Sequence, residues 1–180
     1  GNVSKGYLED EAWRVPAMVA FPGRIEGSRQ DRDHLVHGVD IPATICDYAG
    51  VPPLPRMTEA RSWPRLLEGE GDAPWRDHLV GETSIRDTSA AVRDDRYKTI
   101  FYKDAPTKVY DMQKDPLEMH DLAGTAQGKA IAARHRDRLR AYIRRIELCP
   151  EPTRNNLPPR RKKYYADYVA WYQSILEEAV

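Results

Sequence analysis

The chain has 180 residues with 28 basic and 28 acidic side chains, so its formal net charge is zero. This length fits one domain or slightly more, and a neutral chain lacks the overall field that draws basic proteins to nucleic acid or anionic membranes. No apolar run reaches the roughly 20 residues of a membrane-spanning helix, and we expect no signal peptide because the N-terminal stretch has no apolar core. Two cysteines exclude a disulfide scaffold.

The first half of the chain predicts one strand and two helices. Residues 15–23 form a short apolar run bounded by prolines and a Pro-Gly turn, which is typical of a buried strand. Asp40 stands before a first-turn proline and is expected to cap a helix that ends at Gly50. Ser62 is expected to cap a short helix that ends near Gly69.

The second half predicts a small antiparallel sheet, because its strand-like runs are separated by connections too short for crossover helices. The expected strands are residues 78–82, 90–93, 97–102 and 108–112. A turn at 94–96 joins the middle two strands, and we expect Val92 and Ile100 on the buried side.

Helical patterns follow the predicted sheet. Residues 115–118 combine Asp, Pro and Glu as a capping-box analogue that opens a helical turn. A long helix is expected over 128–148, where apolar residues and His135 recur at a spacing of three to four. A proline-rich linker at 149–159 precedes a last segment whose aromatic stripe predicts core packing. The stripe consists of Tyr164, Tyr168, Trp171, Tyr172 and Ile175.

Basic residues are concentrated between Lys129 and Lys163, where twelve Lys or Arg stand against three acids. Such a block could bind nucleic acid. No aromatic or glycine motif of a nucleic-acid module accompanies it, so the pattern favours the solvated basic face of a helix and no nucleic-acid partner.

Two clusters of chemically active residues can be weighed from the sequence. Asp33, His34, His37 and Asp40 could direct two imidazoles at one metal ion, but Gly38 interrupts the helical register that this would need. Cys149 stands just before two prolines in a loop with no activating partner nearby in sequence. Residue chemistry alone therefore predicts an α+β unit without a complete active site or metal site.

A series of short motifs nevertheless occurs in a specific order. Residues 5–16 are similar to Lys-x-x-x-Tyr-Glu-Glu-x-x-Arg-x-Pro, and residues 21–23 to Trp-Pro-Gly. Residues 35–51 are similar to Leu-Val-x-x-x-Asp-x-x-Pro-Thr followed by Asp-x-Ala-Gly, and residues 109–123 add Val-Tyr-Asp-Met-x-x-Asp-Pro-x-Glu. Over about residues 5–148, this order resembles the C-terminal part of a type I, formylglycine-dependent sulfatase of the alkaline phosphatase superfamily.

The departures from this family pattern also carry information. Glu9 stands where the family usually has Tyr, and the nucleophile motif Cys/Ser-x-Pro-Ser/Thr-Arg is absent. The Asp-x-x-x-Asp-His/Asn-Gly element that holds calcium in the family is absent as well. We therefore expect the chain to be a piece that begins shortly after the metal-binding loop and is inactive alone.

The resemblance implies an α/β fold, or α+β for this piece alone. It would be the C-terminal portion of an alkaline-phosphatase-like fold, with a small four-stranded antiparallel sheet packed by a long helix. Residues 1–76 would be the last elements of the large sulfatase domain, and 77–148 the antiparallel-sheet subdomain. Residues 149–180 would be a linker and a final amphipathic helix.

The resemblance also implies a function, the hydrolysis of sulfate esters. Lys5 would be a catalytic cation on a sulfate oxygen, and Glu82 and Arg86 would bind substrate from the loop at 81–88. No metal ligand is expected in this chain, whereas Ca²⁺ and formylglycine are expected in the full-length enzyme. The expected partners are a sulfated small molecule or glycan and the N-terminal sulfatase portion, in a periplasmic or secreted location.

Two alternatives remain open from the sequence. The chain could be the C-terminal part of a phosphonate monoester hydrolase or a related phosphoesterase. It could also be a non-catalytic interaction module that uses the basic helix or the aromatic stripe to bind a partner.

Overall fold

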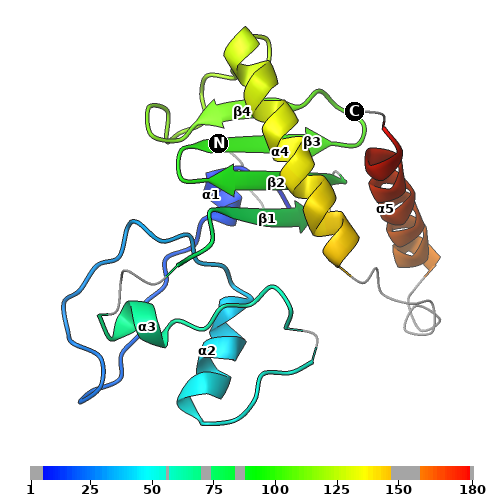
Figure 1. Cartoon of the computed structure of the whole chain (residues 1–180). Coiled ribbons are helices and arrows are strands. Elements are labelled where there is room, and N and C mark those ends of the chain that lie inside the picture. Colours follow the sequence, from blue (N-terminus) through cyan, green and yellow to red (C-terminus); the bar gives the residue numbers. More distant parts are fainter. Residues whose placement is uncertain (1–5, 56, 70–73, 84–87, 147–158, 179–180) are drawn as a thin grey trace. The chain divides into compact units, whose positions relative to one another are not determined.

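The computed structural model describes residues 6–55, 57–69, 74–83, 88–146 and 159–178, with the side chains of the last range described from 165 onward (Figure 1). These residues form two compact units. One unit is drawn from residues 1–15 and 80–180, and the other from residues 16–79. No helix in these ranges is long and apolar enough to cross a membrane.

A four-stranded sheet lies at the centre of the first unit and confirms the predicted strands. Its order is β1 (His78–Thr83), β2 (Ser89–Asp94), β3 (Tyr97–Tyr102) and β4 (Lys108–Asp111). β2 and β3 pair antiparallel with Ala91 opposite Ile100, and β3 and β4 pair antiparallel with Thr99 opposite Val109.

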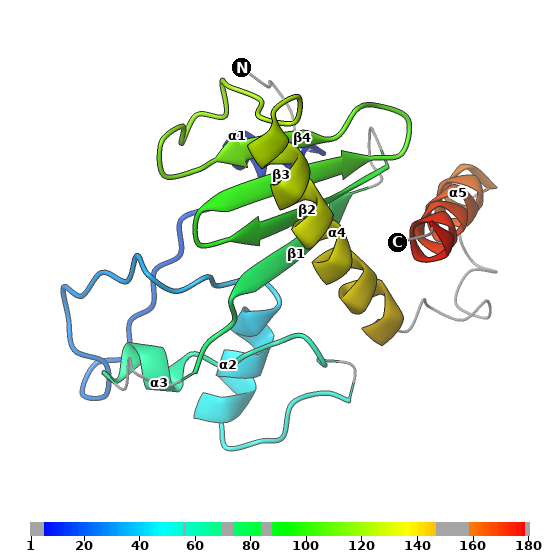
Figure 2. The same ribbon diagram turned by 45° about the horizontal axis from the view of Figure 1, so that its top comes forward.

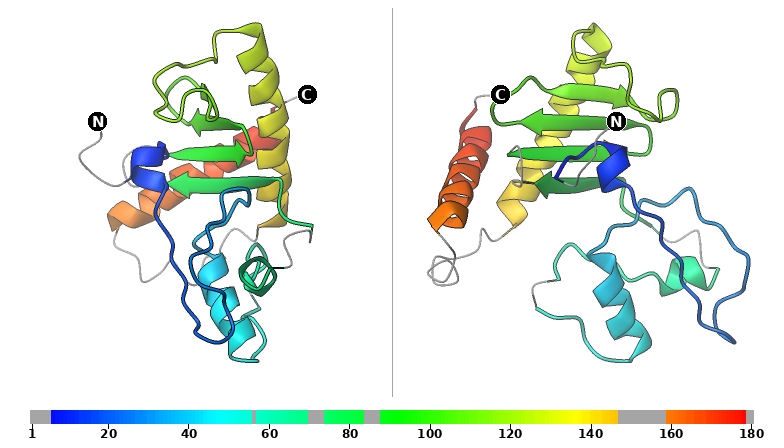
Figure 3. Two further views of the ribbon diagram at one scale, coloured as in Figure 1. Left: turned by 90° about the vertical axis from the view of Figure 1, so that its left-hand side faces the viewer. Right: turned by 180° about the vertical axis from the view of Figure 1, so that it is seen from behind.

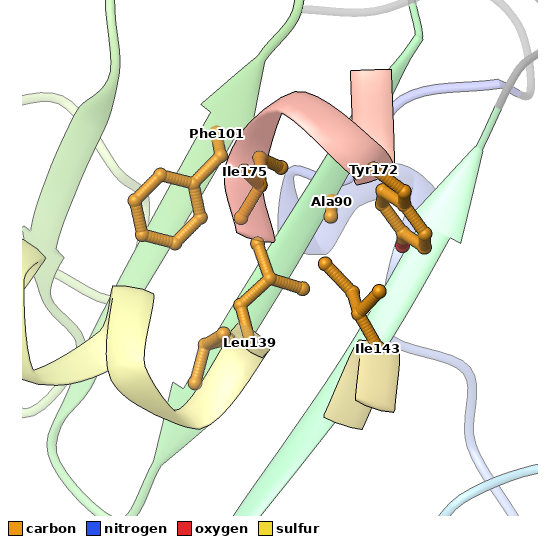
Figure 4. Packing of buried hydrophobic residues seen from close by; sticks show 7 residues of the cluster. Ala90, Phe101, Leu139, Ile143, Tyr172 and Ile175 are labelled. Carbon is orange, nitrogen blue, oxygen red and sulfur yellow. The ribbon is translucent and has the colours of Figure 1, made fainter. Parts of the chain in front are cut away.

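Helices cover one face of this sheet. α4 (Ala126–Arg145) runs diagonally across the strands (Figure 2), and α5 (Pro159–Glu177) packs against both α4 and the sheet. The core between them, shown in Figure 4, confirms the predicted core role of the aromatic stripe for its residues 172 and 175. The buried members are Ala90, Val92, Phe101, Leu139, Ile143, Tyr172 and Ile175.

The opposite face of the sheet is covered as well. The N-terminal segment with α1 (Asp10–Trp13) lies there, behind the sheet in the view of Figure 1 and on the far side from α4 in Figure 3. Leu8 and Ile100 belong to the core on this side, whereas Val92 belongs to the core under α4. The prediction that Val92 and Ile100 share one buried face was therefore wrong, because both faces of the sheet are buried and alternate residues point to opposite sides.

The start of α4 depends on a residue without a side chain. Thr125 caps the helix, and its hydroxyl oxygen accepts the N–H of Gly128 at 2.9 Å. A Cβ at Gly128 would lie only 1.8 Å from the carbonyl oxygen of Leu122. The preceding stretch at 115–118 forms a hydrogen-bonded turn rather than the predicted helical turn, and Glu118 takes a left-handed conformation with φ of 56°.

The second unit contains α2 (Asp40–Tyr48) and α3 (Pro64–Leu67), which match the two helices predicted there. Their N-caps are Val39 and Trp63, rather than Asp40 and Ser62. Asp40 instead forms a buried ion pair with Arg76, in which both carboxylate oxygens lie 2.6 Å from guanidinium nitrogens. Burial alone would raise the pKa of Asp40, but hydrogen bonds from Arg76 and from backbone N–H groups hold it below its usual value.

The strand predicted at residues 15–23 does not form. The segment has no strand partner and exposes large apolar side chains, including Met18 at 96% and Phe21 at 41%. A strand needs a neighbour to satisfy its backbone hydrogen bonds, and the only other strand residues in the described part of this unit are His78 and Leu79, where β1 begins. The apolar side chains that predicted a buried strand are therefore exposed to solvent.

Candidate functional site

The N-terminal segment that follows Lys5 is anchored to the sheet by a buried lysine. Lys98 of β3 has a fully buried side chain, and its ammonium donates to the carbonyl oxygen of Leu8 at 2.9 Å and to Asp10 Oδ1 at 2.7 Å. It also forms an ion pair with Glu118. An unpaired ammonium is strongly disfavoured inside the protein, and the N-terminal segment supplies partners of Lys98. The buried lysine therefore stabilises the attachment of this segment to the sheet.

Glu118 completes the anchor from the other side. Its Oε2 atom accepts the backbone N–H of Asp10 at 2.6 Å, so it binds both the lysine and the backbone that the lysine holds. Burial raises the pKa of Glu118 above its usual value, although the hydrogen bond with Lys98 acts in the opposite direction. Two carboxylates thus share one ammonium in a site that links α1, β3 and the turn after β4.

Trp13 packs the same segment against β1. Its ring lies over Gly81 so closely that a Cβ on that glycine would be 2.4 Å from the ring. The Lys98 ammonium lies 5.4 Å from the centroid of the indole, within cation–π range. Farther along the sheet, Glu9 Oε1 accepts the hydroxyl of Tyr102 at 3.0 Å. The backbone from residue 8 to residue 13 is therefore held by charge, packing and hydrogen bonds together.

The other predicted site residues are distributed unevenly over the structure. Lys5 and Arg86 lie outside the described residues. Glu82 stands at the end of β1, and its Oε2 atom accepts hydrogen bonds from the hydroxyl of Tyr172 at 2.5 Å and from that of Tyr168. Burial raises the pKa of both tyrosines, so they remain protonated donors. Glu82 therefore links the end of β1 to α5.

The residues weighed as a metal cluster do not converge on one point. Asp40 is held by Arg76, His34 lies 2.8 Å from Asp31, and His37 Nδ1 accepts the N–H of Val39. Within the ranges that the structure describes, no group of three or more His, Cys, Asp or Glu could hold a metal ion. Cys149 lies outside these ranges.

One polar network was missed by the sequence analysis. Asp94 Oδ2 accepts from His135 Nε2 at 2.9 Å and from Arg134 and Arg138, and His135 Nδ1 lies 2.8 Å from the hydroxyl of Thr99. Since an ionised carboxylate only accepts, Nε2 carries the proton, and in the neutral ring Nδ1 accepts from Thr99. His135 and Thr99 are fully buried, and the network joins α4 to the β2–β3 hairpin.

Electrostatics fix the charge states of this network. Burial alone would raise the pKa of Asp94, but hydrogen bonds from His135 and from two backbone N–H groups hold it far below its usual range. Burial lowers the pKa of His135, against the raising effect of its hydrogen bond to Asp94. The helical spacing of His135 with apolar residues indicated burial, whereas nothing in the sequence indicated its partners.

Comparison with known proteins identifies the class to which this architecture belongs. Residues 1–145 match the family described as N-sulphoglucosamine sulphohydrolase, C-terminal. The chain therefore belongs to this sulfatase family, and its fold is that of the C-terminal region of alkaline phosphatase superfamily enzymes. The resemblance read from the short motifs is confirmed.

Individual relatives are of the same kind. The Delta 4,5-hexuronate-2-O-sulfatase of Bacteroides thetaiotaomicron is 30% identical over an alignment of 167 positions, and this alignment covers 88% of this chain and 34% of the relative. The N-acetylglucosamine-6-O-sulfatase of the same organism is 29% identical over an alignment of 138 positions, which covers 71% of this chain and 24% of the relative. The solved structure of a 2-O GAG sulfatase matches with a TM-score of 0.59 and 31% identity, covering 67% of this chain and 28% of that one. The chain thus spans a quarter to a third of the length of these relatives.

Proposed function

We propose that the whole enzyme containing this chain hydrolyses sulfate esters of sugars. The observation that carries the proposal is the sulfatase family match over residues 1–145, which includes the anchored N-terminal segment. The two curated relatives are named for sulfate positions on hexuronate and N-acetylglucosamine, which supports a sulfated sugar as the substrate class.

Lys5 would be the contribution of this chain to the chemistry. A lysine ammonium on a sulfate oxygen neutralises charge on the group that is attacked, and a fixed donor of this kind is most effective when the protein holds it in advance. The Lys98 anchor supports this role, because it fixes the backbone from Leu8 to Asp10, only a few residues after Lys5.

Formylglycine would supply the nucleophile in such an enzyme, and calcium would neutralise further charge on the sulfate. The residues of this chain do not fit either group. The sequence has no Cys/Ser-x-Pro-Ser/Thr-Arg motif, and the described residues contain no cluster that could hold a metal ion. Both groups would therefore be held by other parts of the whole enzyme.

The segment at 81–88 would contribute to substrate specificity. Arg86 would bind a carboxylate or a second sulfate of the sugar through its paired guanidinium donors. Glu82 would act from the beginning of this segment, where the hydroxyls of Tyr168 and Tyr172 hold its carboxylate.

The unit formed by residues 16–79 would bind the rest of the large sulfatase domain. Its exposed apolar side chains include Met18, Phe21, Ile45 and Leu54, with exposed fractions between 41% and 96%. A surface of this composition is typical of an interface. The strand-like segment at 15–23 would add to the edge of a sheet supplied by the N-terminal portion.

Hydrolysis assays on the whole enzyme test this function. An aryl sulfate, an aryl phosphate and an aryl phosphonate monoester are compared at equal concentration, with the 180-residue chain alone as the control. We expect the sulfate to be hydrolysed fastest by the whole enzyme, and no turnover by the chain alone. Faster turnover of the phosphate or phosphonate would replace sulfatase by phosphoesterase as the function.

Arg86→Ala should lower kcat/KM for an anionic sugar sulfate and leave kcat/KM for the aryl sulfate unaffected.

A further inference from the structure

A polar hollow of about 200 Å³ lies on the α4 and α5 side of the first unit. It is bounded by the end of β3, the loop after it, the middle of α4 and the last turns of α5. Its volume is below the approximately 300–1,000 Å³ of sites for drug-sized ligands, which limits an occupant to about one ring. The lining residues that matter for recognition are Phe101, Lys103, Arg136, Trp171, Ser174 and Glu178.

The charges around this hollow do not balance. Arg136 lies 5.1 Å from the centroid of the Phe101 ring and is paired with Glu178, so its charge is already matched. Lys103 lines the same hollow, is half-buried, and has no ion pair with a carboxylate among the described residues. One positive charge is left over, and it favours an anionic ligand.

The remaining wall suits a sugar. Trp171 is half-buried and is held in place by its contact with the Tyr172 ring at 5.4 Å between centroids. Next to it, the hydroxyl of Ser174 donates to the carbonyl oxygen of Trp171 at 2.7 Å, which leaves its oxygen free to accept from a ligand hydroxyl. The half-buried Trp171 ring offers a small apolar contact for ring C–H groups, and the neighbouring polar groups offer partners for hydroxyls and an acid group.

We propose that this hollow binds a single anionic sugar ring, either a uronate or a sulfated hexose. Lys103 would pair with the acid group, Trp171 would pack against the ring, and Arg136 would stiffen the wall through Phe101 and Glu178. The choice of sulfated or uronate sugars rests on the proposed function, whereas the preference for an anion rests on Lys103 alone. The hollow lies on the helix-covered face of the sheet, whereas the Lys98 anchor lies on the other face, and the role proposed for the hollow is binding alone.

Direct binding measurements test this inference without any hydrolysis assay. Glucuronate, glucose 6-sulfate, glucose and inorganic sulfate are titrated into the chain by calorimetry. We expect both anionic sugars to bind more tightly than glucose and inorganic sulfate. Lys103→Met should weaken glucuronate binding about tenfold, the loss of roughly one charged hydrogen bond. Trp171→Phe should weaken it by a smaller factor.

The control variant is Lys129→Met, which removes an exposed α4 lysine that does not line the hollow. Melting temperatures of all variants verify that they fold. The inference is overturned if glucose binds as well as glucuronate, if inorganic sulfate binds as tightly as the anionic sugars, or if Lys103→Met and Lys129→Met behave alike. If the sugars bind as expected but the whole enzyme does not cleave sulfate esters, the proposed function fails and this site stands.

Discussion

Lys98 shows how one residue can connect distant parts of this chain. Its partners Asp10 and Glu118 lie 88 and 20 positions away, and all three meet beneath the N-terminal segment. The net contribution of a complete buried ion pair is small, but removing one member leaves charges buried without a partner. Removing any one of these three side chains should therefore destabilise the attachment of the N-terminal segment to the sheet.

Lys98→Met should lower the free energy of unfolding by about 3–5 kcal/mol, because it leaves the buried carboxylate of Glu118 and the partly buried one of Asp10 without their shared cation. The matched control is Lys108→Met, which removes a partly exposed ammonium 3.4 Å from Glu9 and should cost less than about 1 kcal/mol. Urea unfolding followed by circular dichroism measures both. Equal losses in the two variants would contradict the role of Lys98 as the anchor.

His135 should make the stability of the fold depend on pH. Its pKa in the folded chain is lowered by burial, so below about pH 6.5 the unfolded chain takes up a proton that folded His135 does not. Stability is therefore present above this pH and is lost as the pH falls, by at most about 1.4 kcal/mol per pH unit for one proton.

His135→Gln should remove this part of the pH dependence, because the amide cannot titrate. Unfolding free energies of the parent and the variant are compared between pH 5.5 and 7.5. His120→Gln, at a histidine whose side chain is 82% exposed, should keep the slope of the parent. A His135→Gln protein with the full parental slope would show that another group is responsible.

For single residues, the sequence could predict which side chains are buried better than which ion-pair and hydrogen-bond partners they have. The recurrence of His135 with Ile131 and Leu139 placed it on the inner face of a helix. A lysine within a strand gave no sign that it would be buried, because its carboxylates are remote in sequence. Charged networks are formed by tertiary contacts, which local patterns do not encode.

Among the elements, those with strong local signals were predicted well. The four strands are short apolar runs with turn residues between them, and α4 follows a clear apolar periodicity. The strand expected at 15–23 does not form, because no strand of the described residues pairs with this segment.

Gly128 tests whether the start of α4 is packed as tightly as the structure indicates. Gly128→Ala should destabilise the fold by at least about 1 kcal/mol, because the new Cβ would meet the backbone of Leu122. Gly124→Ala, where a Cβ meets nothing within 4 Å, should change the stability by no more than about 0.5 kcal/mol. Thermal melts of both variants compare the sites, and a Gly128→Ala protein as stable as the parent would contradict the packing.

For the whole molecule, the two units differ in how completely they bury apolar groups. The unit with the sheet has cores on both faces, whereas the unit of residues 16–79 exposes Met18, Ile45 and Leu54. The chain spans 34% of the hexuronate sulfatase to which it is similar. Both observations support the proposal that the chain is part of a larger sulfatase that covers the exposed unit.

The central claim is that this chain supplies a catalytic cation to a sulfate ester hydrolase. The most direct measurement is kcat/KM for an aryl sulfate in the whole enzyme with Lys5→Ala, Lys5→Arg and, as the control, Lys129→Ala. We predict a loss of about 10²–10³ for Lys5→Ala, a smaller loss for Lys5→Arg because the charge is retained, and no change for the control. A Lys5→Ala enzyme with the kcat/KM of the parent would contradict the claim.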